Sequence, residues 1–199
     1  MIRPIMLGVA LMGAASVMAQ EDAAGLHGKR SNSQTGRLAV IWDAAEERMA
    51  RQADAWFKDG DYPRVIQLLR FRGELYPDDE EANSDLGWML ENVEEEGEAL
   101  KVYQTFRRRN PQNPDGPWLE ASYRFRKKDY APIPALLEPT IAKEPHPNSY
   151  RTLAHAYERT SRLADSERIW VTYLARFPDD ETAKANLRRV REKRAKAGG

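Results

Sequence analysis

The tetrapeptide YPDD at residues 76–79 returns as NPQN at residues 110–113 and as FPDD at residues 177–180. A weaker copy, EPHP, lies at residues 144–147. The prolines at positions 77, 111, 145 and 178 are separated by 34, 34 and 33 residues. A constant period of this length indicates a repeated pair of secondary-structure elements. The sequence therefore predicts a repeat architecture.

Small and large apolar residues return at fixed offsets inside the periods. Small residues suit positions where two helices cross closely, large residues fill the space beside the crossing, and proline ends the second helix. The matching positions are Ala53, Trp56, Val65 and Leu69 in the first period, Gly87, Leu90, Ala99 and Tyr103 in the second, and Ala154, Tyr157, Ser166 and Trp170 in the fourth.

This pattern resembles the tetratricopeptide-repeat (TPR) family over roughly residues 44–195. The resemblance implies an all-α solenoid with about four helix pairs and a C-terminal capping helix. The predicted repeats span approximately residues 46–79, 80–113, 114–146 and 147–180, and the capping helix spans residues 181–195. The whole predicted domain covers residues 37–195. Each pair leaves an apolar face open, and the next pair covers it.

The third period departs from this pattern. Its first helix reads best with Trp118 and Phe125 on the core face, which requires one extra residue before the helix. Pro132 and Pro134 suit the opening turn of its second helix. Pro139 falls inside that helix and is predicted to kink or shorten it.

Residues 1–19 read as a secretory signal peptide, with a positive start at Arg3, an apolar run and a small-residue cleavage site at residues 17–19. An uncleaved anchor is the alternative, but the run is shorter than the ~20 residues that a span requires. Residues 20–36 are polar and are predicted to be a flexible linker. We expect an exported bacterial protein, periplasmic or secreted, without a stable membrane span after cleavage.

The composition excludes several classes of function. Lys and Arg balance Asp and Glu, so no global positive charge favours a nucleic-acid partner. The absence of cysteine excludes disulfides, thiolate catalysis and thiolate metal sites. The sequence has no zinc-protease, nucleophile-elbow, P-loop or dinucleotide-binding motif. The acidic run at residues 94–96 is typical of a solvated turn rather than a metal site. We therefore predict no catalytic residue, cofactor or metal ion.

In the TPR family the first helix of each pair lines a concave groove, so the resemblance assigns groove positions here. They form a surface that is acidic at one end, aromatic in the middle and basic at the other. For the aromatic residues, packing between repeats is the alternative interpretation, and for the basic end it is a solvated face. The candidates are Asp54, Phe57, Trp88, Glu91, Asn92, Tyr123, Arg126, Arg151, His155 and Arg159.

Aromatic and arginine side chains on such a surface are typical of binding hot spots. We therefore expect a non-catalytic scaffold of the cell envelope that binds a peptide or helix of a partner protein in the groove. The alternative function is binding of a polyanion or membrane surface through the basic C-terminal helix. The family's clamp on chaperone C-termini is not expected, because Ala50 and Asp54 replace its Lys and Asn.

Overall fold

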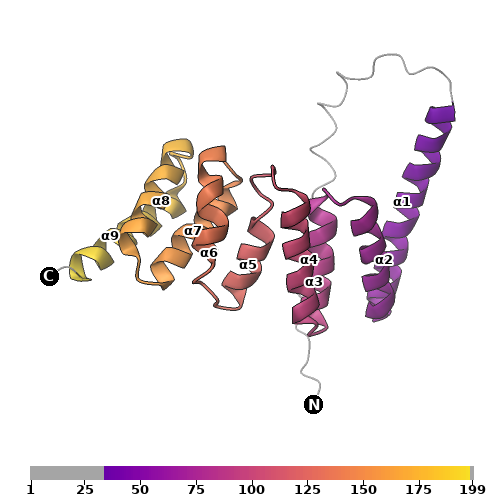
Figure 1. The fold of residues 1–199 in the computed structure, drawn as a ribbon, viewed down its shortest axis with the longest axis horizontal. Helices are drawn as coiled ribbons and strands as arrows, with labels where there is room; N and C mark the ends of the chain where they lie inside the picture. Colours follow the sequence, from indigo (N-terminus) through magenta and orange to yellow (C-terminus); the bar gives the residue numbers. More distant parts are fainter. Residues whose placement is uncertain (1–33, 198–199) are drawn as a thin grey trace. The chain divides into compact units, whose positions relative to one another are not determined.

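The computed structural model describes residues 34–197, which form α-helices and one 3₁₀ helix, with no strand in that range (Figure 1). The predicted signal peptide, residues 1–19, and residues 20–33 of the predicted linker lie outside the described residues. The prediction of a linker up to residue 36 is wrong at its end, because residues 34–36 form the first turn of α1. The helices are α1 (Gln34–Lys58), α2 (Tyr62–Leu75), α3 (Glu80–Asn92), α4 (Glu96–Arg109), α5 (Trp118–Arg126), α6 (Ile133–Leu137), the 3₁₀ helix η2 (Glu138–Lys143), α7 (Pro147–Arg159), α8 (Leu163–Arg176) and α9 (Glu181–Ala197).

The chain divides into two compact units, of which the second begins at Ala53, inside α1. In this second unit, helices that follow one another along the chain pack together from α2 to α9. The helix pairs α1/α2, α3/α4, α5/α6 and α7/α8, followed by α9, confirm the predicted all-α solenoid of about four pairs with a capping helix.

The repeated tetrapeptide joins one helix pair to the next. Its proline follows the end of a second helix, and in the two copies that end in aspartate, this aspartate caps the helix that follows. Asp79 accepts a hydrogen bond from the Ala82 amide at 3.2 Å, and Asp180 accepts one from the Ala183 amide at 2.9 Å. Such capping satisfies backbone donors that the helix itself leaves free. The sequence period is therefore also a period of helix ends and helix starts.

Two buried clusters form the core of the second unit. One gathers side chains from α2 to α5, including Leu86, Tyr103 and Phe106. The other gathers side chains from α5 to α9, including Tyr150 and Trp170. Trp118, at the start of α5, packs against both clusters. The core therefore runs through the third repeat without a break.

Gly87 lies where α3 crosses α4, as its small size predicts. A Cβ atom at this position would be 2.2 Å from Cε1 and Cζ of Tyr103 and 2.5 Å from its Oη. The Tyr103 ring thus lies directly against the backbone of α3, and it is 2% exposed. This contact confirms the small-against-large packing that the sequence pattern predicts for the second repeat.

The third repeat has an irregular second helix. α2, α4 and α8 each have 14 residues, whereas α6 has five and continues as the six-residue η2. Pro134 lies in the first turn of α6 and Pro139 in the first turn of η2. A proline in a helix interior removes a hydrogen bond and clashes with the preceding turn. Pro139 therefore shortens the helix, as predicted.

Candidate functional site

The predicted groove residues all lie on the first helices of the four pairs. We call the surface formed by α1 from Ala53 onward, α3, α5 and α7 the first-helix surface. Asp54 and Phe57 lie on α1, Trp88, Glu91 and Asn92 on α3, Tyr123 and Arg126 on α5, and Arg151, His155 and Arg159 on α7.

Phe57 and Trp88 form an aromatic pair that is open to solvent. Their side chains are 42% and 51% exposed, and their ring centroids lie 6.3 Å apart. The Phe57 ring also lies 5.7 Å from Tyr62. Met89 and Leu90, which follow Trp88 on α3, are buried and fix the helix that carries the indole. Large exposed rings on a rigid helix are well suited to contact a partner.

Tyr123 belongs to the core instead of the exposed surface. It is 7% exposed, and its ring lies 5.7 Å from that of Tyr103. Its hydroxyl donates a hydrogen bond to the Glu96 carbonyl at 3.3 Å. The assignment of Tyr123 to the groove is thus corrected, and packing between repeats, the alternative interpretation, describes this residue.

Glu91 and Arg126 pair with each other across two repeats. Arg126 Nη2 lies 2.6 Å from Glu91 Oε1, and the Tyr103 hydroxyl donates to the same oxygen at 2.8 Å. Burial and the neighbouring Glu91 carboxylate raise the pKa of Tyr103, so its hydroxyl keeps its proton. Asn92, which is exposed, donates from its amide to the Trp88 carbonyl at 2.7 Å. These groups connect α3, α4 and α5.

The basic end of the surface is also engaged in contacts. Arg151 Nη2 bonds to Asp180 Oδ2 and to the Tyr173 hydroxyl, each at 2.7 Å. The His155 ring meets that of Trp170 edge-on at 5.1 Å, and burial lowers the pKa of His155, which keeps the imidazole neutral at pH 7. Arg159 is exposed and has no ion-pair partner within residues 34–197. A neutral, packed His155 is unsuited to holding an anion.

The predicted charge gradient is therefore largely used inside the protein. Asp54, half-buried on α1, has no ion-pair partner in the described part of the chain. Ion pairs inside the protein already engage three of these charges, since Glu91 pairs with Arg126 and Arg151 pairs with Asp180. What the first-helix surface offers to a partner is mainly the aromatic pair, with Asp54 and Arg159 as charges still open to it.

The structure resembles solved structures of helical repeat proteins. A crystal structure of the MamA protein matches with a TM-score of 0.58 and 14% identity, over 75% of this chain and 82% of that one. MamA from Desulfovibrio magneticus RS-1 matches with a TM-score of 0.50 and 17% identity, over 75% and 95%. A tetratricopeptide-repeat protein from Parabacteroides merdae matches with a TM-score of 0.50 and 13% identity, over 71% and 56%. The chain has a TPR-like fold.

Comparisons of sequence, in contrast to those of structure, found no related protein. No family model matches the chain, and no curated protein matches it. None of the helices within residues 34–197 has the length and apolar character needed to cross a bilayer.

The basic C-terminal helix of the TPR-like fold is held against the last pair by ion pairs. Arg189 and Lys193 lie 2.8 and 2.7 Å from the carboxylate of Glu158 on α7. Arg191 and Arg194 lie 2.8 and 2.9 Å from Glu167 on α8. We call these four contacts the α9 clasp. Because these charges are already neutralised, the structure gives less support to the alternative function, the binding of polyanions or membrane surfaces.

The α9 clasp predicts a loss of stability in acid. Burial acts to raise the pKa of Glu158, but hydrogen bonds from Arg189 and Lys193 outweigh it and lower the pKa to about 2. A folded-state pKa below the unfolded value of 4.5 means that the contacts stabilise the protein fully above that pH, and the stabilisation disappears as the pH falls toward about 2. Replacing Glu158→Gln should therefore lower the free energy of unfolding by about 1 kcal/mol at neutral pH, allowing for screening by water, and have little effect near pH ~2.

Thermal unfolding followed by circular dichroism across this pH range tests this prediction. Glu192→Gln is the matched control, because Glu192 lies on α9 without an ion-pair partner in the described residues. A difference between wild type and Glu158→Gln that is equally large in strong acid contradicts the role assigned to the clasp.

Sequence reasoning missed the contacts that link one first helix to the next. Glu91 pairs with Arg126 and Glu158 with Lys193, each at a separation of 35 residues, and Glu158 pairs with Arg189 at 31. These separations are close to the repeat length, so partners of opposite charge one repeat apart were a detectable signal.

Proposed function

We propose that the protein is a non-catalytic scaffold that holds a segment of a partner protein on its first-helix surface, with Phe57 and Trp88 as the anchor. The observation that carries the proposal is the aromatic pair itself: Phe57 on α1 is 42% exposed, and Trp88 is 51% exposed on α3, whose other face is buried. Aromatic residues on a rigid scaffold supply large contact area at a low entropy cost, and they dominate binding energy in many interfaces. The TPR-like fold supports the proposal, because such repeats stack into extended binding surfaces.

The surroundings of the histidines support a non-catalytic role. His146 caps α7, with its Nδ1 accepting from the Asn148 amide at 3.2 Å, and His155 is packed against Trp170. His27 lies outside the described residues. Within residues 34–197, no group of acidic and histidine side chains is placed to hold a metal ion. We place this scaffold in the cell envelope, on the basis of the signal peptide that the sequence predicts.

Replacing Trp88→Ala tests the proposal, with Phe71→Ala as the matched control. Phe71 is 53% exposed but lies on α2, a second helix. We expect Trp88→Ala to weaken partner binding by about 2 kcal/mol, which is about thirtyfold in affinity, with an unchanged helical spectrum. Phe71→Ala should bind as the wild type does.

The measurement is a quantitative pull-down from envelope extract of an exporting host, followed by titration of each captured protein. Partners that depend on Trp88 and tolerate high salt support the aromatic anchor. Partners that bind the Trp88→Ala variant normally, but are lost with rising salt or on removal of residues 191–199, contradict it and favour the polyanion alternative.

A further inference from the structure

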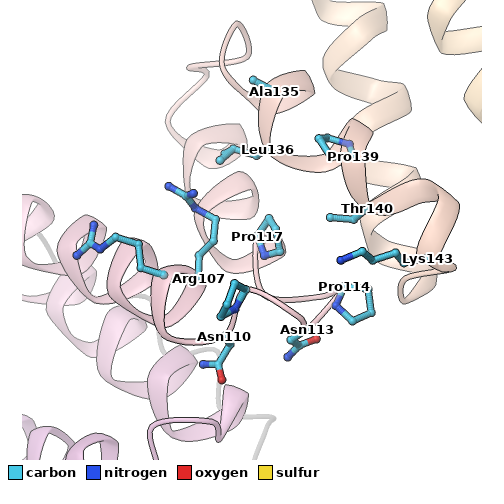
Figure 2. A pocket seen from close by; sticks show the side chains of 12 residues that line it. Arg107, Asn110, Asn113, Pro114, Pro117, Ala135, Leu136, Pro139, Thr140 and Lys143 are labelled. Atoms are coloured by element: carbon cyan, nitrogen blue, oxygen red, sulfur yellow. The ribbon is translucent and has the colours of Figure 1, made fainter.

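A hollow lies at the irregular third repeat, which does not include the aromatic pair. It is formed by the end of α4, the loop at residues 110–117, α6 and η2, and it has a volume of about 330 Å³ (Figure 2). We call it the third-repeat pocket. Its volume lies within the range of small binding sites, which are mostly about 300–1,000 Å³.

The pocket is a consequence of the short second helix. α6 ends at Leu137 after five residues, whereas α2, α4 and α8 have 14. Its wall contains Pro111, Pro114 and Pro117 from the loop and Pro139 from η2. Because each proline has a fixed φ and no amide proton, this wall is stiff and apolar and has few donors of its own. A preformed wall of this kind suits an extended segment, which loses little entropy against it.

The polar part of the pocket is cationic. Arg107, Arg108 and Lys143 line it, and its lining includes no carboxylate. Arg107 is fixed by the buried carboxylate of Glu120, with Nε 2.9 Å from Oε2. Arg108 and Lys143 have no carboxylate partner within residues 34–197. Figure 2 shows Lys143 reaching from η2 toward the prolines of the loop.

We infer that the third-repeat pocket binds a short acidic segment of a partner protein. The carboxylates of the segment pair with Arg108 and with Lys143, and a neighbouring apolar side chain packs against Leu136 and the proline wall. Charge complementarity selects the anion, since Arg108 and Lys143, which have no carboxylate partner among the described residues, repel any basic segment. A nucleic acid is the poorer match, because the lining holds no aromatic side chain on which a base could stack.

A labelled peptide tests this site with three variants. The probe is a fluorescein-labelled heptapeptide in which glutamate and leucine alternate, measured by fluorescence anisotropy, with glutamine replacing glutamate in the control peptide. The double variant Arg108→Glu with Lys143→Glu should weaken binding at least about tenfold. Ala135→Phe, which fills the pocket from α6 without changing charge, should weaken it similarly.

Two further variants control for charge and for the first-helix surface. Arg188→Glu reverses an exposed cation on α9, outside the pocket, and should change the affinity less than about threefold. Trp88→Ala should leave it unchanged, which separates this site from the aromatic anchor.

Any one of the following results overturns the inference. Wild-type protein that fails to bind the glutamate peptide at millimolar concentrations excludes the site. Binding that survives Ala135→Phe, or that responds equally to Arg188→Glu, shows general electrostatic attraction. Tighter binding of an oligothymidylate probe than of the peptide, with the same variant pattern, assigns the pocket to nucleic acid instead.

Discussion

Replacing Gly87→Ala is expected to lower the free energy of unfolding by about 2–3 kcal/mol. The new methyl group would lie 2.2 Å from two ring carbons of Tyr103. The ring has little room to move, because Tyr103 is 2% exposed, bonds through its hydroxyl to Glu91 at 2.8 Å and lies against Tyr123. Either α3 must separate from α4 or the hydrogen bond must break, and both outcomes destabilise the second repeat.

Gly73→Ala is the matched control for this substitution. Gly73 is also a buried helical glycine, but a Cβ atom there would meet only Asn83 Oδ1, at 3.8 Å. Because alanine is a better helix former than glycine, we expect this variant to be more stable than wild type by about 0.5–1 kcal/mol.

Urea unfolding of the two variants gives the comparison directly. Removing the ring in a Gly87→Ala, Tyr103→Leu double variant should recover part of the stability lost by Gly87→Ala alone, because the clash is removed. Equal denaturation midpoints for wild type and Gly87→Ala contradict the assigned contact between α3 and α4.

Removing α9 by ending the chain at Asp180 is expected to destabilise the repeat array by on the order of 5 kcal/mol. Ala183 and Val190 of α9 are buried, and Leu187 packs beside them against the core of α8. Their loss leaves an apolar face of the last pair in water. The loss also leaves Glu158, whose side chain is 9% exposed, without its cationic partners.

A chain ending at Arg194 is the control for the truncation. It keeps the buried residues and all four contacts of the α9 clasp. Its melting temperature should match that of the full chain, while the chain ending at Asp180 should melt far lower or aggregate. If both truncated chains melt alike, α9 is dispensable and the capping role is wrong.

The sequence predicted the fold well, because in a repeat the same residue types return wherever a helix ends or two helices pack closely. The period of the YPDD copies locates the ends of second helices and the caps at Asp79 and Asp180. The glycine at position 87 records a close approach of two helices. Pro139 predicted the short second helix of the third repeat.

The candidate site was less predictable, because it depends on helix rotation and on side-chain partners. An error of one residue turns a helix by about 100°. In the third repeat, with its extra residue, this is enough to place Tyr123 in the core and not on the surface. The charged positions were found correctly on the first helices, but their partners lie one repeat away, as Glu91 and Arg126 show. Such partners are found only by comparing charged positions one repeat apart, and not from the pattern within a single helix.

Trp118 couples the unfolding of the two core clusters. Its indole is shared by the two core clusters, so neither half can leave the other without exposing part of it. In a solenoid with only nearest-neighbour contacts, the terminal repeats are free to fray one by one. Here amide protons on α4 and α7, on either side of Trp118, should exchange with solvent deuterium at a common rate, as members of one cooperative unit.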